Sequence, residues 1–217
     1  MASDEVVVRR RADGALELRV NGVFVMDDVE TTSERRLAEV VLDHGARDVL
    51  VGGLGLGFTV RTLLADARVR RVVVAELHAE VVRTVCRPRP APAGGIGLVE
   101  PRLDVVIGDV RDLVTAQPDA CADAVLLDVD NGPDSLVHAG NAAVYGDAFM
   151  AECARVLRPG GTLAVWSMAD SPGLRATLDA HLVDVAAESV PVRLQGRAEE
   201  YWILSGRTAA RTTAPVS

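Results

Sequence analysis

The strongest constraint on the fold is a glycine-rich turn at residues 52–57, which reads Gly-Gly-Leu-Gly-Leu-Gly. The apolar run 48–52 before it is typical of a buried strand, and the residues after it have helical spacing. Glycines at such a turn let backbone N–H groups and a helix N-terminus approach a ligand without obstruction by Cβ atoms. The turn therefore predicts a nucleotide or nucleoside site in an α/β protein.

The spacing of the glycines separates the common nucleotide motifs. A dinucleotide-binding G-x-G-x-x-G that starts at Gly53 requires a glycine at position 58, where the chain has Phe58. A P-loop requires a lysine, and the chain contains none. What remains is G-x-G-x-G at Gly53, Gly55 and Gly57, the spacing of class I S-adenosylmethionine-dependent enzymes. A tight turn without a ligand is the alternative.

Strand-like and helix-like segments alternate along the chain. The Asn21-Gly22 pair predicts a hairpin over 16–25, and helical spacing predicts a helix over 31–44. Further strands are predicted at 48–52, 71–77, 103–107, 122–128, 162–166, 183–192 and 201–204, and helices from the glycine turn to 64 and at 79–86, 143–157 and 171–182. This order predicts an α/β fold with a mainly parallel seven-stranded sheet and helices on both faces.

The same pattern predicts the organisation of the chain. Residues 1–45 form a hairpin and helix extension, 46–207 form the nucleoside-binding domain, and 208–217 form a flexible tail. Residues 87–102 are rich in proline and glycine and are predicted to form a loop or a lid. Pro159-Gly160-Gly161 is predicted to end a helix before the next strand begins at 162.

Acidic residues stand at the predicted carboxyl ends of the strands, where α/β sheets bind their ligands. Glu76 ends the second strand and can accept hydrogen bonds from both ribose hydroxyls of a nucleoside. Asp109 follows the third strand, and it can either accept from an adenine amino group or cap the helix that begins near Val110. The order of glycine turn, Glu76 and Asp109 therefore predicts an adenosyl site.

The fourth strand ends in two acids, Asp128 and Asp130. A carboxylate beside a reacting centre can bind an amine and accept its proton, so both are candidate catalytic residues. The alternative for Asp130 is an Asx-type turn over 130–133. Neither the histidines nor the cysteines have metal-ligand spacing, so no metal is expected.

The charge balance bears on the kind of partner. The chain has 31 acidic residues against 23 arginines, a formal net charge of −8. Such a chain favours a cationic or small-molecule partner over nucleic acid. Charges interrupt every apolar stretch, so no membrane association is expected. The N-terminal residues lack the order of a signal peptide, so a cytoplasmic location is expected.

Six segments, taken in order, resemble the spermidine synthase (polyamine aminopropyltransferase) family of the class I methyltransferase superfamily. They are VLVGGLGLG, VVVAEL, DVVIGDV, AVLLDVDNGP, VYGDAFMAECARVLRPGGTLAVW and EYWILSGR. The resemblance runs from about Leu16 to Arg207 and implies a Rossmann-like fold and a transferase. Its co-substrate would be S-adenosylmethionine or the decarboxylated form, with a small amine as acceptor and a homodimer as the assembly.

The resemblance also implies roles for individual residues. The glycine turn, Glu76 and Asp109 would hold the adenosyl group, and Asp128 would lie beside both that group and the reacting amine. Glu34 and Tyr145 would contribute to substrate binding.

The chain departs from the family pattern around the amine site. Leu56 stands where the family carries an acid that holds the amino group of the co-substrate. Thr32-Ser33-Glu34 replaces a Tyr-His-Glu gate, Val25 replaces a glutamine, and Met150 stands in place of an aromatic residue. The two-aspartate segment is shortened to 128–130. The nucleoside half of the pattern is therefore better kept than the polyamine half.

Three functions remain open from the sequence. Aminopropyl-type transfer with release of methylthioadenosine is the leading hypothesis. A methyltransferase, or another enzyme acting on intact S-adenosylmethionine, is the second. A non-catalytic binding protein on a degenerate synthase fold is the third, since fold alone does not fix function.

Overall fold

The computed structural model describes residues 4–86, 97–134, 136, 139–194 and 196–211. The predicted loop at 87–102 and the predicted tail at 208–217 therefore lie partly outside the described residues.

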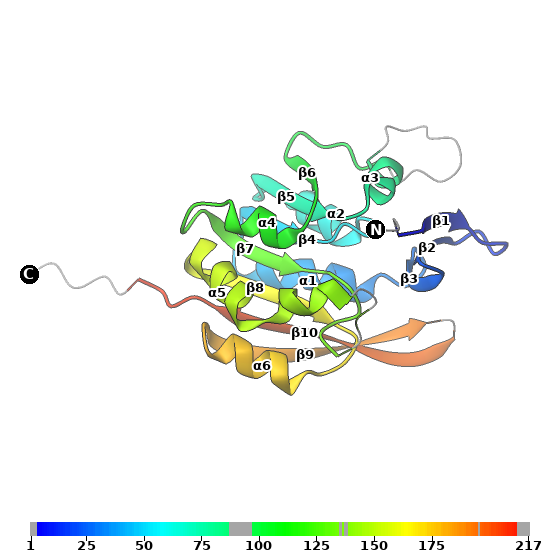
Figure 1. The fold of residues 1–217 in the computed structure, drawn as a ribbon. Coiled ribbons are helices and arrows are strands. Elements are labelled where there is room, and N and C mark those ends of the chain that lie inside the picture. The colour runs from blue at the N-terminus through cyan, green and yellow to red at the C-terminus, as the bar shows by residue number, and fades with distance from the viewer. Residues whose placement is uncertain (1–3, 87–96, 135, 137–138, 195, 212–217) are drawn as a thin grey trace, which may run out of the picture.

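A seven-stranded sheet forms the centre of the molecule (Figure 1). In spatial order its strands are β6 (Leu103–Ile107), β5 (Arg71–Glu76), β4 (Asp48–Gly52), β7 (Ala122–Leu127), β8 (Leu157–Ser167), β10 (Arg197–Arg207) and β9 (Val183–Leu194). The pairs from β6 to β8 are parallel, whereas β10 is antiparallel to both β8 and β9. The predicted Rossmann-like fold with a mainly parallel sheet is confirmed.

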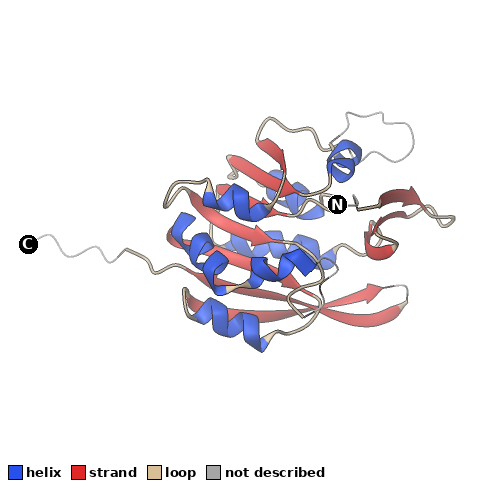
Figure 2. Ribbon diagram, viewed as in Figure 1, coloured by secondary structure: helices blue, strands red, loops and turns tan. Residues whose placement is uncertain are grey.

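Helices cover both faces of this sheet (Figure 2). One face packs against α1 (Thr32–Asp43), α2 (Phe58–Ala65) and α3 (Ala79–Val85), and the other against α4 (Val110–Thr115), α5 (Asp147–Val156) and α6 (Pro172–Asp179). The central strands are apolar over most of their length because both of their faces are buried under helices. Each face has its own hydrophobic core cluster.

A separate three-stranded antiparallel sheet precedes the main sheet. It consists of β1 (Val6–Arg10), β2 (Leu16–Val20) and β3 (Val23–Asp27). Asn21 and Gly22 both have positive φ, 52° and 76°, which is the geometry of the predicted tight hairpin turn. The hairpin is confirmed, whereas β1 was not predicted from the sequence, although its valine run is typical of a strand.

The Pro159-Gly160-Gly161 segment differs from the prediction. It does not separate a helix from a strand, because β8 begins at Leu157 directly after α5 and runs through all three residues. Leu157 already pairs with Ala122 of β7, and the register shifts by the next pair. The positive φ of Gly160, 77°, accommodates this irregularity. The predicted helix at 143–157 is also divided, into a 3₁₀ helix η1 (Ala139–Tyr145) and α5.

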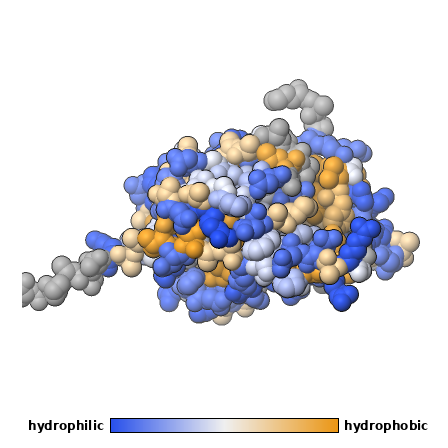
Figure 3. Space-filling model, turned by 90° about the horizontal axis from the view of Figure 1, so that it is seen from below, coloured by the Kyte–Doolittle hydropathy of each residue, from blue (hydrophilic) through white to orange (hydrophobic). Residues whose placement is uncertain are grey.

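The surface is mainly polar. Figure 3 shows one face covered largely by hydrophilic residues, with hydrophobic residues in separate patches. Within the part of the chain that the structure describes, no helix is long and apolar enough to cross a membrane.

Strand register brings the carboxyl ends of the central strands together. Gly52 lies opposite both Ala75 and Leu127, and Glu76 lies opposite Ile107. The backbone of Gly53 then comes so close to β7 that a Cβ atom on it would lie 2.1 Å from the carbonyl oxygen of Asp128. This approach is open only to glycine.

We expect Gly53→Ala to lower the free energy of unfolding by on the order of 3 kcal/mol, from left-handed backbone strain together with overpacking. Gly45→Ala is the matched control, because Gly45 also has a positive φ but open space around it; its strain alone should cost about 1 kcal/mol. Urea denaturation measures both values. Equal losses in the two variants would contradict the importance of the contact with Asp128.

Candidate functional site

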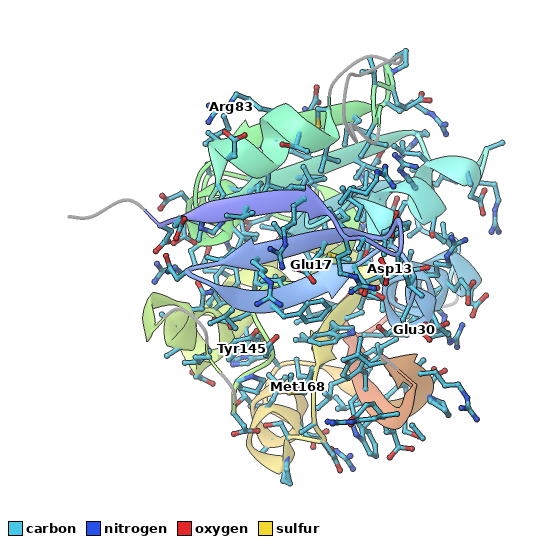
Figure 4. The ribbon with its side chains drawn as sticks, turned by 90° about the vertical axis from the view of Figure 1, so that its right-hand side faces the viewer. Asp13, Glu17, Glu30, Arg83, Tyr145 and Met168 are labelled. Carbon is cyan, nitrogen blue, oxygen red and sulfur yellow. The ribbon has the colours of Figure 1, made fainter. Side chains whose placement is uncertain are left out.

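A pocket opens at the carboxyl ends of β4, β5, β6 and β7. Its lining includes Gly53, Gly55, Glu76, Asp109, Asp128 and Asp130. The three-stranded sheet supplies further lining from β2 and β3. Figure 4 looks at this end of the molecule and shows that sheet lying across it, with Glu17 on it. The structure thus gathers most of the predicted site residues around one pocket.

The glycine turn divides its residues between the pocket and the core. Gly53 and Gly55 line the pocket, whereas Gly57 is not among its described lining residues. Gly57 has a φ of 83° at the N-cap of α2, and a Cβ atom there would lie 3.2 Å from Val85. Two of the predicted glycines therefore face the space for a ligand, and the third permits the turn into the helix.

Leu56 belongs to the core. Its side chain is fully buried, and its backbone N–H donates to the sulfur of Met26 at 3.2 Å. The neighbouring Gly55 lines the pocket in its place. The position of the missing family acid therefore does not open onto the pocket in this chain.

Glu76 is the most tightly held acid of the pocket. Its Oε2 accepts a hydrogen bond from Leu54 N at 2.9 Å, and its Oε1 accepts one from His78 N at 2.8 Å. The side chain is buried, and these donors fix the carboxylate at the rim of the glycine turn. A carboxylate has about four acceptor positions on its two oxygens, so it can also accept hydrogen bonds from hydroxyl groups.

Asp109 caps a helix and also lines the pocket. It is the N-cap of α4 and accepts from Arg111 N at 2.8 Å, and the Arg111 guanidinium also bonds to its carboxylate. It lines the pocket as well. The capping interpretation is confirmed, and a role in ligand binding stays a prediction.

The hydroxyl of Thr59 links the Asp128 carboxylate to the backbone of Glu34. The Thr59 Oγ1 lies 2.9 Å from Asp128 Oδ2 and 3.2 Å from the carbonyl oxygen of Glu34. The pKa of Asp128 is raised to about 6, mainly by burial and also by the charge of Glu76, while the hydrogen bond with Thr59 lowers it. Such a carboxyl group changes its charge close to neutral pH and can take up a proton there.

Glu34 comes to this position from the first turn of α1 and is buried. Burial and the nearby charge of Asp128 raise its pKa to about 7, and its Oε2 accepts from the Ser33 hydroxyl at 2.9 Å. Two acids with raised pKa values therefore interact electrostatically, although they are 94 positions apart in the sequence. Asp128 lines the pocket, whereas Glu34 is not among its described lining residues.

Three further residues were not predicted from the sequence: Thr59 and Tyr201, which interact with the acids, and Trp166, which packs against Tyr201. Trp166 and Tyr201 pack with ring centroids 4.9 Å apart, and burial and the charge of Glu34 raise the pKa of Tyr201. Trp166 lies on β8 and Tyr201 on β10, and the pairing of these two strands is not revealed by strand alternation alone. Thr59 could have been predicted as a site residue, because its hydroxyl lies in the first helical turn after the glycines.

The remaining predicted residues have mainly structural contacts. Asp130 has a φ of 61°, and its carboxylate accepts from Asn131 N at 2.9 Å and Asn141 Nδ2 at 3.0 Å, which favours the turn interpretation. The Tyr145 hydroxyl donates to the carbonyl oxygen of Val129, and burial raises its pKa. Met150 is fully buried in the core.

Among the described residues, no group of three or more His, Cys, Asp or Glu side chains could hold a metal ion.

The chain is similar in sequence to a known protein family and to individual relatives. Residues 50–165, more than half of the chain, match the family described as methyltransferase domain. A polyamine aminopropyltransferase from Mycobacterium tuberculosis is 35% identical over 168 residues, which are 76% of this chain and 31% of the relative. The chain thus spans less than a third of the length of that relative.

Two solved structures share the fold. A spermidine synthase in complex with the transition-state analogue AdoDATO superposes with a TM-score of 0.77 at 14% identity, covering 96% of this chain and 71% of that one. An N-methyltransferase from Bradyrhizobium japonicum superposes with a TM-score of 0.59 at 14% identity, covering 81% of this chain and 94% of that one.

The raised pKa of Glu34 makes stability depend on pH. Between the ordinary value of 4.5 and about 7, the folded state binds the Glu34 proton more tightly than the unfolded state, so the free energy of unfolding should fall as pH rises. Glu34→Gln should remove on the order of 2 kcal/mol of this fall between pH 4 and pH 8. Urea denaturation across that range measures it.

The control is Glu39→Gln, which changes an exposed acid of the same helix. It should leave the pH profile of stability as in the wild type. If Glu34→Gln also left the pH profile of stability unchanged, this would contradict a raised pKa of Glu34 in the folded state.

Proposed function

Because this chain belongs to the methyltransferase-domain family and is spermidine synthase-like within that superfamily, we propose that it transfers an aminopropyl-type group from a sulfonium nucleoside to a small amine and releases methylthioadenosine. The observation that carries the proposal is Asp128, an acid with a raised pKa value that lines the glycine-lined pocket and acts electrostatically on a second acid with a raised pKa value, Glu34.

The nucleoside half of the site uses the strand ends. Glu76 accepts the ribose hydroxyls, Asp109 lies on the adenine side, and Gly53 and Gly55 leave room for the ligand next to the backbone. Gly57 contributes by permitting the turn.

The charge of the pocket favours a cationic co-substrate without a carboxylate. Acids line it on several elements, and its described lining residues include no arginine. The carboxylate of intact S-adenosylmethionine would lie among like charges there, whereas the decarboxylated form presents only positive groups. We therefore assign the decarboxylated nucleoside as the preferred co-substrate.

The chemistry takes place at the acid pair. The neutral amine nitrogen attacks the methylene carbon next to the sulfonium, the carbon–sulfur bond breaks, and its electron pair leaves with methylthioadenosine. The new ammonium then gives a proton to the Asp128 carboxylate. Since the sulfonium is a good leaving group, the protein mainly aligns the two reactants and excludes water.

The remaining predicted residues have supporting roles. Glu34 binds the acceptor amine beside Asp128, and Asp130 and Tyr145 shape the wall between the two halves of the site. In this scheme the extension over 1–45 supplies Glu34 and, through its described residues from Asp4 to Val25, part of the pocket lining, and the domain over 46–207 supplies the nucleoside site.

Methyl transfer from intact S-adenosylmethionine is the second candidate. It is supported by the family match over residues 50–165 and by the fold shared with an N-methyltransferase. Its product would be S-adenosylhomocysteine instead of methylthioadenosine.

Incubation with decarboxylated S-adenosylmethionine and putrescine or another small diamine should yield methylthioadenosine, measured by liquid chromatography and mass spectrometry. Asp128→Asn should lower kcat by about 10²- to 10⁴-fold, because the new ammonium loses its proton acceptor. In the wild type kcat/KM should rise with pH as Asp128 loses its proton near pH 6.

Asp147→Asn is the control, since Asp147 is exposed at the start of α5 and pairs with His181; its activity should equal that of the wild type. Release of S-adenosylhomocysteine from intact S-adenosylmethionine, with no methylthioadenosine from the decarboxylated form, would replace the proposal with methyl transfer. No product from either nucleoside with any amine would contradict both.

A further inference from the structure

The ring of His78 joins two acids at the mouth of the pocket. Its Nδ1 lies 3.1 Å from Oε1 of Glu76, and its Nε2 lies 3.3 Å from Oδ2 of Asp4. The other oxygen of Asp4 accepts from Asn21 Nδ2 at 2.8 Å. All four residues line the pocket. The segment before β1 is therefore linked to Glu76 through this imidazole.

The hydrogen bonds of Glu76 leave little capacity for a nucleoside. A carboxylate has about four acceptor positions on its two oxygens. Leu54 N takes one on Oε2, while the backbone N–H and the ring of His78 take two on Oε1. One position remains, on Oε2, whereas the two neighbouring hydroxyls of a ribose need two.

We infer that the His78 ring occupies the place on Glu76 that a ribose hydroxyl takes, so that nucleoside binding displaces the ring and frees the segment at Asp4. The inference rests on the proposed function, in which Glu76 binds the ribose. His78 is then a positioning residue that sets the affinity of the pocket, since the nucleoside must break its contact with Glu76.

The acids around the His78 ring raise its pKa, so displacement of the ring is coupled to the loss of a proton. Glu76 on β5 and Asp4 before β1 both raise the pKa of His78, with the hydrogen bond to Glu76 as the largest cause. His78 is also the N-cap of α3, which carries Glu80 in its first turn. On the β6 side of the pocket, Asp109 is paired with Arg111.

Loss of the contact with Glu76 lowers the pKa of the ring, so binding releases a proton to solvent. By linkage, nucleoside affinity then rises with pH through the titration of His78.

Calorimetric titration with methylthioadenosine tests the inference. This nucleoside is a thioether without the positive charge of a sulfonium, so no ligand charge acts on the carboxylates of the pocket. Titrations at pH 6.5 in two buffers of different ionisation enthalpy measure the proton released. We expect a fraction of a proton per nucleoside from the wild type and none from His78→Ala, with wild-type affinity roughly tenfold weaker at pH 5.5 than at pH 7.5.

Two further variants sharpen the test. Asp4→Asn keeps the contact with Glu76 but removes a charge, so the pH dependence should move to lower pH, and this readout also serves if His78→Ala does not fold. His181→Ala removes an imidazole paired with Asp147 near the surface and should release the same proton as the wild type.

The outcomes separate this inference from the proposed function. Tight nucleoside binding with equal proton release in the wild type and His78→Ala would overturn the role of His78 and leave the proposed function standing. An absence of nucleoside binding in the wild type at every pH would overturn both.

Discussion

The close approach of the glycine turn to the end of β7 is the contact on which the rest of the site depends. Asp128 N donates to the carbonyl oxygen of Gly52 at 2.8 Å, and Gly53 lies where no side chain fits against the Asp128 carbonyl. This contact fixes the turn, the start of α2 and the Asp128 carboxylate together. Thr59 in the first turn of α2 then extends the same unit to Glu34.

Several acids converge on one pocket, and each is stabilised differently. Glu76 has backbone donors and Asp109 has an arginine and a helix N-terminus. The hydrogen bonds of Asp128 and Glu34 offset only part of the effect of burial, so the pKa values of both acids are raised toward neutrality. The two acids assigned to the reacting centre in the proposed function are therefore the ones whose raised pKa values allow proton exchange near neutral pH.

Sequence patterns predicted most of the fold because periodicity and turn chemistry are local. They predicted every strand of the main sheet, the Asn21-Gly22 hairpin and the gathering of Glu76, Asp109 and Asp128 at one edge. Properties that depend on tertiary packing were not predicted. Examples are the pairing of Leu157 with Ala122, which draws Pro159–Gly161 into β8, and the burial of Leu56 beneath Met26. The meeting of Glu34 with Asp128 required the position of α1 over the sheet.

A crystal structure of the protein with decarboxylated S-adenosylmethionine tests the central claim most directly. The predicted result is a nucleoside in the pocket with its ribose hydroxyls on Glu76, its adenine beside Asp109 and its sulfonium directed toward Asp128 and Glu34. A nucleoside bound elsewhere, or one whose sulfonium points away from this acid pair, would contradict the assignment of the site.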